Sequence, residues 1–166
     1  MANLKMYVHA ITLDPESNSP ILILKEEEGE RTLPIWIGLL EATAIATEME
    51  KIEFARPMTH DLAVNLIKAL NVKIPRIEIT DIKDNTYYAL IFLEKDGELY
   101  QVDARPSDAV AIALRANADI FVNEVVLEKT VPKETQNITQ ASEAKDKEKW
   151  LEILENLDTD SVKYKM

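Results

Sequence analysis

The chain has 166 residues, no cysteine and a formal net charge of −11 at pH 7. This length suffices for one domain with a hydrophobic core, and the lack of cysteine excludes disulfides, thiolate zinc sites and cysteine nucleophiles. Since lysine and arginine supply the affinity for a phosphate backbone, the acidic charge argues against a general nucleic-acid binder. Any chemistry on nucleic acid needs a local basic patch or bound cations.

The first half of the chain predicts three strands and two helices. Apolar alternation predicts strands over 5–13, 21–25 and 31–37, joined by a loop at 14–20 and a charged turn at 26–30 as an antiparallel meander. From residue 41 the apolar residues follow a helical period to about residue 52. A second helix is expected with Thr59 as its N-cap. One face of that helix is apolar and consists of Leu62, Leu66, Ile67 and Leu70.

The second half predicts a hairpin sheet, a third helix and a tail. Strands are expected over 73–82, 87–94 and 99–104, with hairpin turns at 83–85 and 95–97. A helix over 106–116, a strand over 119–122 and a short helix over 125–128 follow. The sequence therefore predicts an α+β domain over 1–129, with an antiparallel or mixed sheet and three main helices. A polar linker at 130–142 precedes a C-terminal amphipathic helix within 143–166, which docks on its own domain or on another subunit.

No apolar run approaches the roughly 18 residues that cross a bilayer, and the N-terminus lacks the apolar core of a signal peptide. A soluble cytoplasmic protein is expected.

Two similar turns concentrate the polar chemistry. One reads Arg56-Pro57-Met58-Thr59-His60-Asp61-Leu62, and the other reads Asp103-Ala104-Arg105-Pro106-Ser107-Asp108-Ala109. Each places an arginine before a proline and an aspartate in the first turn of a helix. Helix starts carry backbone donors that can converge on a ligand. If both turns face one pocket, the chain has an acid-rich site with two arginines.

Each candidate residue has a functional and a structural interpretation. Asp61, Asp103 and Asp108 could hold Mg²⁺ or Mn²⁺ as in metal-dependent nucleases, but first-turn aspartates also simply complement the helix dipole. Arg56 and Arg105 could grip a phosphate, or form an internal salt bridge to the first-turn aspartate of the other turn.

His60 could be a general base or a metal ligand, or a helix-start residue bonded to nearby backbone. Glu41 could complete a carboxylate cluster or merely favour the start of its helix. The sequence leaves these alternatives open.

Together with Pro34-Ile35-Trp36-Ile37-Gly38, the two turns resemble the bifunctional nuclease family in order and spacing, over roughly residues 4–127. The resemblance implies an α+β fold and an activity on both DNA and RNA. It does not supply a set of catalytic residues.

Two hypotheses of different classes result. The first is a nuclease that hydrolyses phosphodiester bonds, with a divalent metal, Mg²⁺ or Mn²⁺, held by Asp61, Asp103 and Asp108. In it Arg56 and Arg105 bind the phosphate of a nucleic acid and His60 acts as base. The second is a non-catalytic regulatory or binding module that works as a homo-oligomer, in which the two turns form a rigid network of aspartates and arginines. Homo-oligomer formation is expected under either hypothesis.

Overall fold

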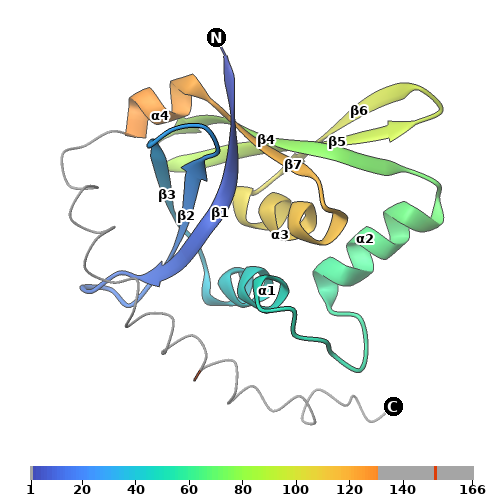
Figure 1. Ribbon diagram of the computed structural model, residues 1–166, viewed down its shortest axis with the longest axis horizontal. Coiled ribbons are helices and arrows are strands. Elements are labelled where there is room, and N and C mark those ends of the chain that lie inside the picture. Colours follow the sequence, from blue (N-terminus) through green and yellow to red (C-terminus); the bar gives the residue numbers. More distant parts are fainter. Residues whose placement is uncertain (1, 131–151, 153–166) are drawn as a thin grey trace.

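A computed structural model of the protein describes residues 2–130 and Glu152 (Figure 1). Across this part of the chain seven strands form one mixed sheet in the order β3-β2-β1-β7-β4-β5-β6. All neighbouring strands are antiparallel except β4 and β7, which are parallel. The α+β class and the antiparallel meander of the first three strands are therefore confirmed. The strands are β1 (Asn3–Leu13), β2 (Pro20–Glu26), β3 (Thr32–Trp36), β4 (Lys73–Lys83), β5 (Thr86–Lys95), β6 (Glu98–Ala104) and β7 (Asp119–Asn123).

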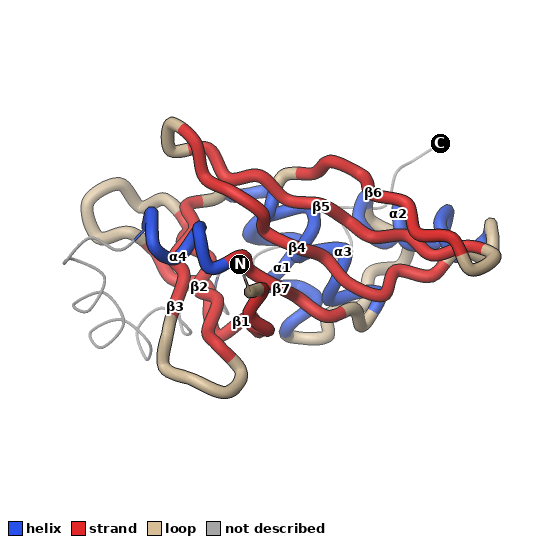
Figure 2. The backbone as a smooth tube through the Cα atoms, turned by 90° about the horizontal axis from the view of Figure 1, so that it is seen from above, coloured by secondary structure: helices blue, strands red, loops and turns tan. Residues whose placement is uncertain are grey.

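Within residues 2–130 the chain also forms four helices: α1 (Leu39–Met49), α2 (Thr59–Ala69), α3 (Pro106–Ala116) and α4 (Glu124–Thr130). Helices α1, α3 and α4 pack on the sheet, whereas α2 packs on α3. Figure 1 shows α1, α2 and α3 on one side of β4 and β5, with α4 apart from them, where it contacts β4 and β7. Viewed from above, β4, β5 and β6 form a long hairpin sheet over these helices (Figure 2).

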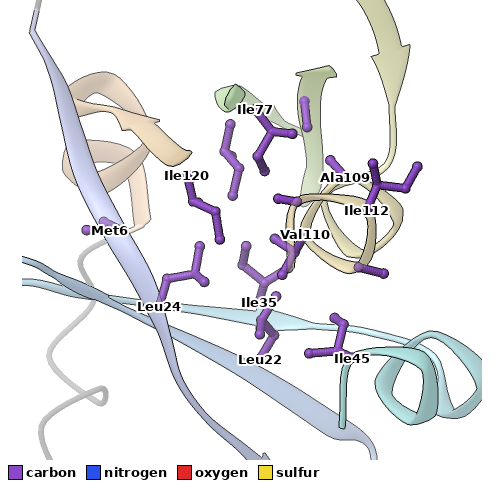
Figure 3. Packing of buried hydrophobic residues seen from close by; sticks show 14 of the residues in the cluster. Met6, Leu22, Leu24, Ile35, Ile45, Ile77, Ala109, Val110, Ile112 and Ile120 are labelled. Atoms are coloured by element: carbon purple, nitrogen blue, oxygen red, sulfur yellow. The ribbon is translucent and has the colours of Figure 1, made fainter. Parts of the chain in front are cut away.

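The third helix is the centre of the core. Five consecutive side chains, enough to go once around the helix, are small or branched and fully or almost fully buried, namely Ala109, Val110, Ala111, Ile112 and Ala113. Figure 3 shows this part of α3 between Ile77 of β4 on one side and Leu22 and Ile35 of β2 and β3 on the other. The sheet therefore bends around α3, and the alanines permit a close approach because they add little volume.

The two hairpin turns form where the sequence predicts them, at 83–85 and 95–97. Asp84 and Asn85 both have positive φ (48° and 60°), and so do Asp96 and Gly97 (52° and 82°). A two-residue type I′ hairpin turn matches the twist of the strands and requires positive φ at both central positions. Asn, Asp and Gly tolerate positive φ best. These turns keep β4, β5 and β6 in register with one another.

The second helix departs from its prediction in two ways. Its first residue is Thr59 and its cap position is Met58, whose N–H donates to Asp61 Oδ2 at 2.9 Å, so Thr59 is not the cap. The apolar face is not buried either: Val64 is the buried side chain, Ile67 is partly buried, and Leu62, Leu66 and Leu70 are exposed. Since α2 packs against α3 on one side, the stripe on the other side has no cover among the described residues.

The predicted linker and C-terminal helix at 130–166 lie outside the described residues, except for Thr130 at the end of α4 and the helical Glu152. No helix in the described part of the chain is both long and apolar enough to cross a membrane. The cytoplasmic location stays a prediction.

Replacement of Ile45 tests the core between α1 and the sheet. Ile45 is fully buried, whereas Leu40 in the same helix is 82% exposed. Ile45→Ala is expected to lower the free energy of unfolding by about 2–5 kcal/mol because it opens a cavity. Leu40→Ala should change it by no more than about 0.5 kcal/mol. Urea unfolding of both variants measures this, and equal effects would contradict the described packing of α1.

Candidate functional site

The two arginine-proline turns meet in space. His60 lies in the first turn of α2 and Asp108 in the first turn of α3, and His60 Nε2 is 2.9 Å from Asp108 Oδ1. Pro106 occupies the first position of α3, where its fixed φ suits a helix start and its missing N–H costs nothing. This start places Asp108 toward α2. The contact joins residues 48 positions apart and brings the two turns into one site.

Arg105 extends this contact to the first helix. Its Nε and Nη2 each lie 2.8 Å from Asp108 Oδ2, and its Nη1 donates to Glu41 Oε1 at 2.9 Å. Glu41 is in the first turn of α1, so the first turns of three helices are joined by four side chains. We call His60, Asp108, Arg105 and Glu41 the polar network.

Gly38 leaves room for Glu41 in this network. A Cβ atom built at Gly38 would lie 2.2 Å from Glu41 Oε2. Any larger residue at position 38 would therefore displace the Glu41 carboxylate from its position beside Arg105. This is a packing requirement, because the backbone of Gly38 is extended (φ −74°, ψ 161°) and open to other residues.

The charges of the network stabilise one another. Partial burial acts to raise the pKa of the Asp108 carboxyl, but hydrogen bonds with His60 and Arg105 oppose it more strongly, so this pKa is lowered from its ordinary value. The pKa of Arg105 is raised, first by Asp108 and then by Glu41. Asp108 is therefore a carboxylate at neutral pH. Because a carboxylate only accepts hydrogen bonds, Nε2 of His60 carries the proton in their contact.

Asp61 belongs to a second, structural contact beneath the network. Its Oδ1 accepts from Arg115 Nε at 2.6 Å, while Arg115 Nη2 donates to the Ala44 carbonyl at 2.8 Å and Nη1 to the Ala111 carbonyl at 2.9 Å. The Arg115 side chain is only 7% exposed. Arg115 thereby fastens α3 to both α1 and α2, and it holds the helix that carries His60.

Two of the six predicted site residues lie apart from the network. Asp103 pairs with Leu90, and its neighbour Val102 pairs with Ile91, a core residue. Because side chains alternate along a strand, Asp103 points to the sheet face opposite the three helices. Arg56 is exposed in the loop between α1 and α2. Neither the Asp103 nor the Arg56 side chain has a hydrogen bond or ion pair within residues 2–130.

The structure thus brings together His60, Asp108 and Arg105 of the predicted residues, with Asp61 close by, and it leaves Asp103 and Arg56 separate. The predicted salt bridge between the two turns is replaced by the contact of His60 with Asp108, because Arg105 pairs within its own turn. Over the described residues no group of three or more His, Cys, Asp or Glu side chains is arranged to hold a metal ion. The three aspartates do not form the predicted metal set in this arrangement, and the need for a metal stays a prediction.

Sequence reasoning weighed Glu41 without including it in the site, and it missed Arg115. A signal for Arg115 was present, because it follows Asp108 by seven residues and therefore lies on the same face of α3. A signal for Glu41 was its place three residues after Gly38, but its partner Arg105 is 64 positions away.

The fold and this site define an α+β domain in which three helix N-termini converge on a partly exposed His-Asp-Arg-Glu network. A model of the bifunctional nuclease domain matches residues 22–135, and the chain belongs to this family.

Relatives support this membership with different coverage. An uncharacterised protein of Mycobacterium tuberculosis is 40% identical over 160 residues, which is 94% of this chain and 96% of the relative. Bifunctional nuclease 1 of Arabidopsis thaliana is 29% identical over 109 residues, 63% of this chain and 34% of its own length. Bifunctional nuclease 2 of Oryza sativa is 30% identical over 114 residues, 66% of this chain and 35% of its own length. The chain therefore matches about a third of each plant protein and nearly all of the mycobacterial one.

Replacement of Arg115 tests the fastening of the three helices. Arg115→Met should lower the free energy of unfolding by about 3 kcal/mol, because it leaves the Asp61 carboxylate without its guanidinium partner and removes the hydrogen bond from Arg115 to the Ala44 carbonyl of α1. Arg31→Met is the control, since Arg31 is half exposed where it pairs with Glu26 and Glu124, and such pairs contribute about 1 kcal/mol or less. Denaturant unfolding measures both. A loss no larger for Arg115→Met than for the control would show that Arg115 does not fasten the three helices.

The lowered pKa of Asp108 predicts a pH dependence. The network stabilises the folded state fully above the ordinary aspartate pKa of about 4. Its contribution is lost as the pH falls through the lower folded-state pKa, because the unfolded chain takes up the proton first. The difference in unfolding free energy between wild type and Asp108→Asn should be largest near neutral pH and should shrink at acid pH. Unfolding curves across that range measure it, and a difference independent of pH would contradict an ionised Asp108.

Proposed function

We propose that this protein hydrolyses phosphodiester bonds in DNA and RNA at the polar network. The observation that carries the proposal is the 2.9 Å contact of His60 with Asp108 next to the exposed guanidinium of Arg105. Membership of the bifunctional nuclease family and the names of its plant relatives support the same activity. The contact and the arginine combine an oriented base with a phosphate-binding group.

Arg105 is the proposed phosphate-binding residue. Its side chain is 65% exposed although Asp108 and Glu41 hold it in place, so part of the guanidinium can face a ligand in a fixed orientation. Guanidinium groups match the geometry of phosphate oxygens. Arg56, in the loop that leads into α2, is the second proposed phosphate contact. The two arginines thus offer guanidinium groups near the starts of α2 and α3 in a chain whose net charge is −11, although Asp108 and Glu41 balance the charge of Arg105.

His60 is the proposed general base. Because Asp108 accepts the Nε2 proton, the other ring nitrogen, Nδ1, is the acceptor in a neutral imidazole. A water near Nδ1 would give its proton to the ring while its oxygen bonds to phosphorus, and the bond from phosphorus to the leaving oxygen would break. The leaving oxygen would take its proton from solvent. Asp108 acts by orienting the ring and by stabilising the imidazolium that forms.

A divalent metal, Mg²⁺ or Mn²⁺, remains part of the proposal, with Asp61, Asp103 and Asp108 as its predicted ligands. The described positions of these residues do not fit one shared ion, since Asp61 is held by Arg115 and Asp103 faces the other side of the sheet. No step of the proposed reaction is therefore assigned to a metal. Comparison of cleavage with Mg²⁺, with Mn²⁺ and with a chelator distinguishes a reaction that needs a metal from one that does not.

The second candidate function is a non-catalytic binding or regulatory module that works as a homo-oligomer. One observation favours it: both network carboxylates, Asp108 and Glu41, already pair with Arg105, so the network also serves as a rigid connection between three helices. Under this hypothesis a replacement in the network would lower stability but would remove no activity.

Nuclease assays with purified protein distinguish the two functions. Single- and double-stranded DNA and RNA are incubated with wild type, His60→Gln and Arg105→Met, each with Mg²⁺, Mn²⁺ or a chelator. Loss of a general base should reduce cleavage by about 100-fold or more. Asp61→Asn and Asp103→Asn test the remaining predicted residues, and only a metal-dependent loss in both would support a shared ion.

His9→Gln is the matched control, because it removes the other histidine of the chain, which lies in β1. It should retain wild-type cleavage, with circular dichroism confirming that every variant is folded. Equal traces of cleavage in wild type, His60→Gln and Arg105→Met would indicate a contaminant, and the non-catalytic module would then be the better description.

A further inference from the structure

We propose that β6 and α2 form a two-fold symmetric interface with a second copy of this chain. The inference is independent of the nuclease proposal, since it rests on a strand edge and a helix face that no described residue covers. β6 is the last strand of the sheet and pairs only with β5 within the described residues. All of its side chains except Ala104 are exposed.

The two edges of the sheet differ in how they are protected. At the β3 edge, Pro34 interrupts the row of backbone donors, and the Tyr87 hydroxyl donates to the Pro34 carbonyl at 3.2 Å. β6 has neither proline nor lysine, and its register with β5 is continuous from Glu98 to Ala104. Edge strands of stable proteins are commonly protected by such residues or by irregular pairing. The β6 edge is thus open to pairing with another strand.

Apolar side chains continue from this edge on the side where the helices lie. Tyr100 and Val102 pair with Leu93 and Ile91, so they share the helix-facing side of the sheet with these partners. Tyr100 is 50% exposed and Val102 is 43% exposed. The edge strand therefore offers apolar side chains together with backbone groups that no strand within residues 2–130 pairs with.

The second helix adds an apolar stripe on the same side. Met58, Leu62, Leu66 and Leu70 follow one another at intervals of four residues, and the three leucines are 50%, 59% and 64% exposed. The N-terminal end of α2 contacts Asp108, just after β6, and its C-terminal end leads into β4 beside the end of β5. Figure 2 shows α2 beneath β6. The stripe and the strand edge therefore border one region of the surface.

The sequence of β6 is complementary to itself. In a two-fold antiparallel pair, opposite residues share a sheet face, so the axis must pass through a pair of identical residues. An axis at Gln101 uses all seven residues and places Tyr100 opposite Val102 of the second copy. Glu98 then lies opposite Ala104, and Asp103 opposite Leu99. Both acidic residues of the strand, Glu98 and Asp103, lie within the paired length, but neither lies opposite another acidic residue.

The size of the surface fits a dimer of this kind. The seven residues of β6 and the apolar stripe of α2, together with the side chains between them, form a surface that lies toward the lower end of the roughly 20–30 residues per partner of a standard interface. The same axis brings the two α2 helices to one side of the joined sheet, where their leucine stripes can pack against each other. A second copy thereby covers both features, whereas an extended peptide would cover the strand edge and leave the stripe exposed.

Sedimentation and light scattering of the full chain test the interface. Wild type is expected to be a dimer at micromolar concentration. Leu66→Glu and Val102→Lys should each shift it to monomer by at least tenfold in the dissociation constant, because each places a charge in the apolar contact. Both side chains are exposed in the described chain, so both variants should fold.

Leu40→Glu is the matched control, because it adds the same charge to an exposed leucine of α1 outside the proposed surface. It should remain dimeric. Hydrogen exchange should also show that the β6 amides become more protected as wild-type protein concentration rises, and that Leu66→Glu removes this effect. A wild-type monomer at all concentrations, or an oligomer that survives both Leu66→Glu and Val102→Lys, would overturn the proposal.

Discussion

The convergence of three helix N-termini is the constraint on which the site depends. Each N-terminus carries partial positive charge and unpaired N–H groups, so three of them close together repel one another. Glu41, Asp61 and Asp108 lie in the first turns of α1, α2 and α3 and supply the opposing charge. Arg105 and Arg115 then connect these carboxylates across the helices. The acidic residues thus have a structural reason to be present whatever the chemistry of the site.

The third helix couples the core to the site. Its apolar face fills the bend of the sheet, while Asp108 and Arg115 on its polar face hold α2, and Arg105 immediately before it holds α1. A shift of α3 within the core would therefore change the position of His60 relative to Asp108. Because cores are densely packed and do not deform gradually, this coupling keeps the two turns at a fixed distance. An oriented histidine needs such a fixed support.

The sequence predicts the elements well because their signals are local. The proline at the start of α3, the two hairpin turns and the strand alternation each depend on neighbouring residues, and each is confirmed. The leucine stripe of α2 was harder to interpret, since a spacing of four residues identifies one helix face but not what covers it. Leu62, Leu66 and Leu70 have that spacing and are exposed. Periodicity therefore predicted the helix correctly without predicting its environment.

The arrangement of the site was less predictable because its contacts are distant in sequence. That the two turns meet could be expected from their likeness, but the partners could not, since His60 reaches Asp108 and Arg105 reaches Glu41. The position of Asp103 depends on strand pairing: Ile91 lies in the core, so Val102 faces the helices and Asp103 faces away. A residue five positions before Asp108 thus lies on the opposite side of the sheet.

The net charge of −11 argues against binding of a polyanion, but the position of Arg105 reduces the force of this argument. Long-range attraction of a polyanion depends on the summed field, which an excess of carboxylates weakens, whereas a contact at a few ångströms depends on the nearest charges. Arg105 is exposed while its two carboxylate partners are mostly shielded behind it. A phosphate that reaches the site therefore meets the guanidinium before it meets Asp108 or Glu41. Under the proposed function, the net negative charge of the chain would weaken the binding of nucleic acid elsewhere on the protein and would favour contact at Arg105.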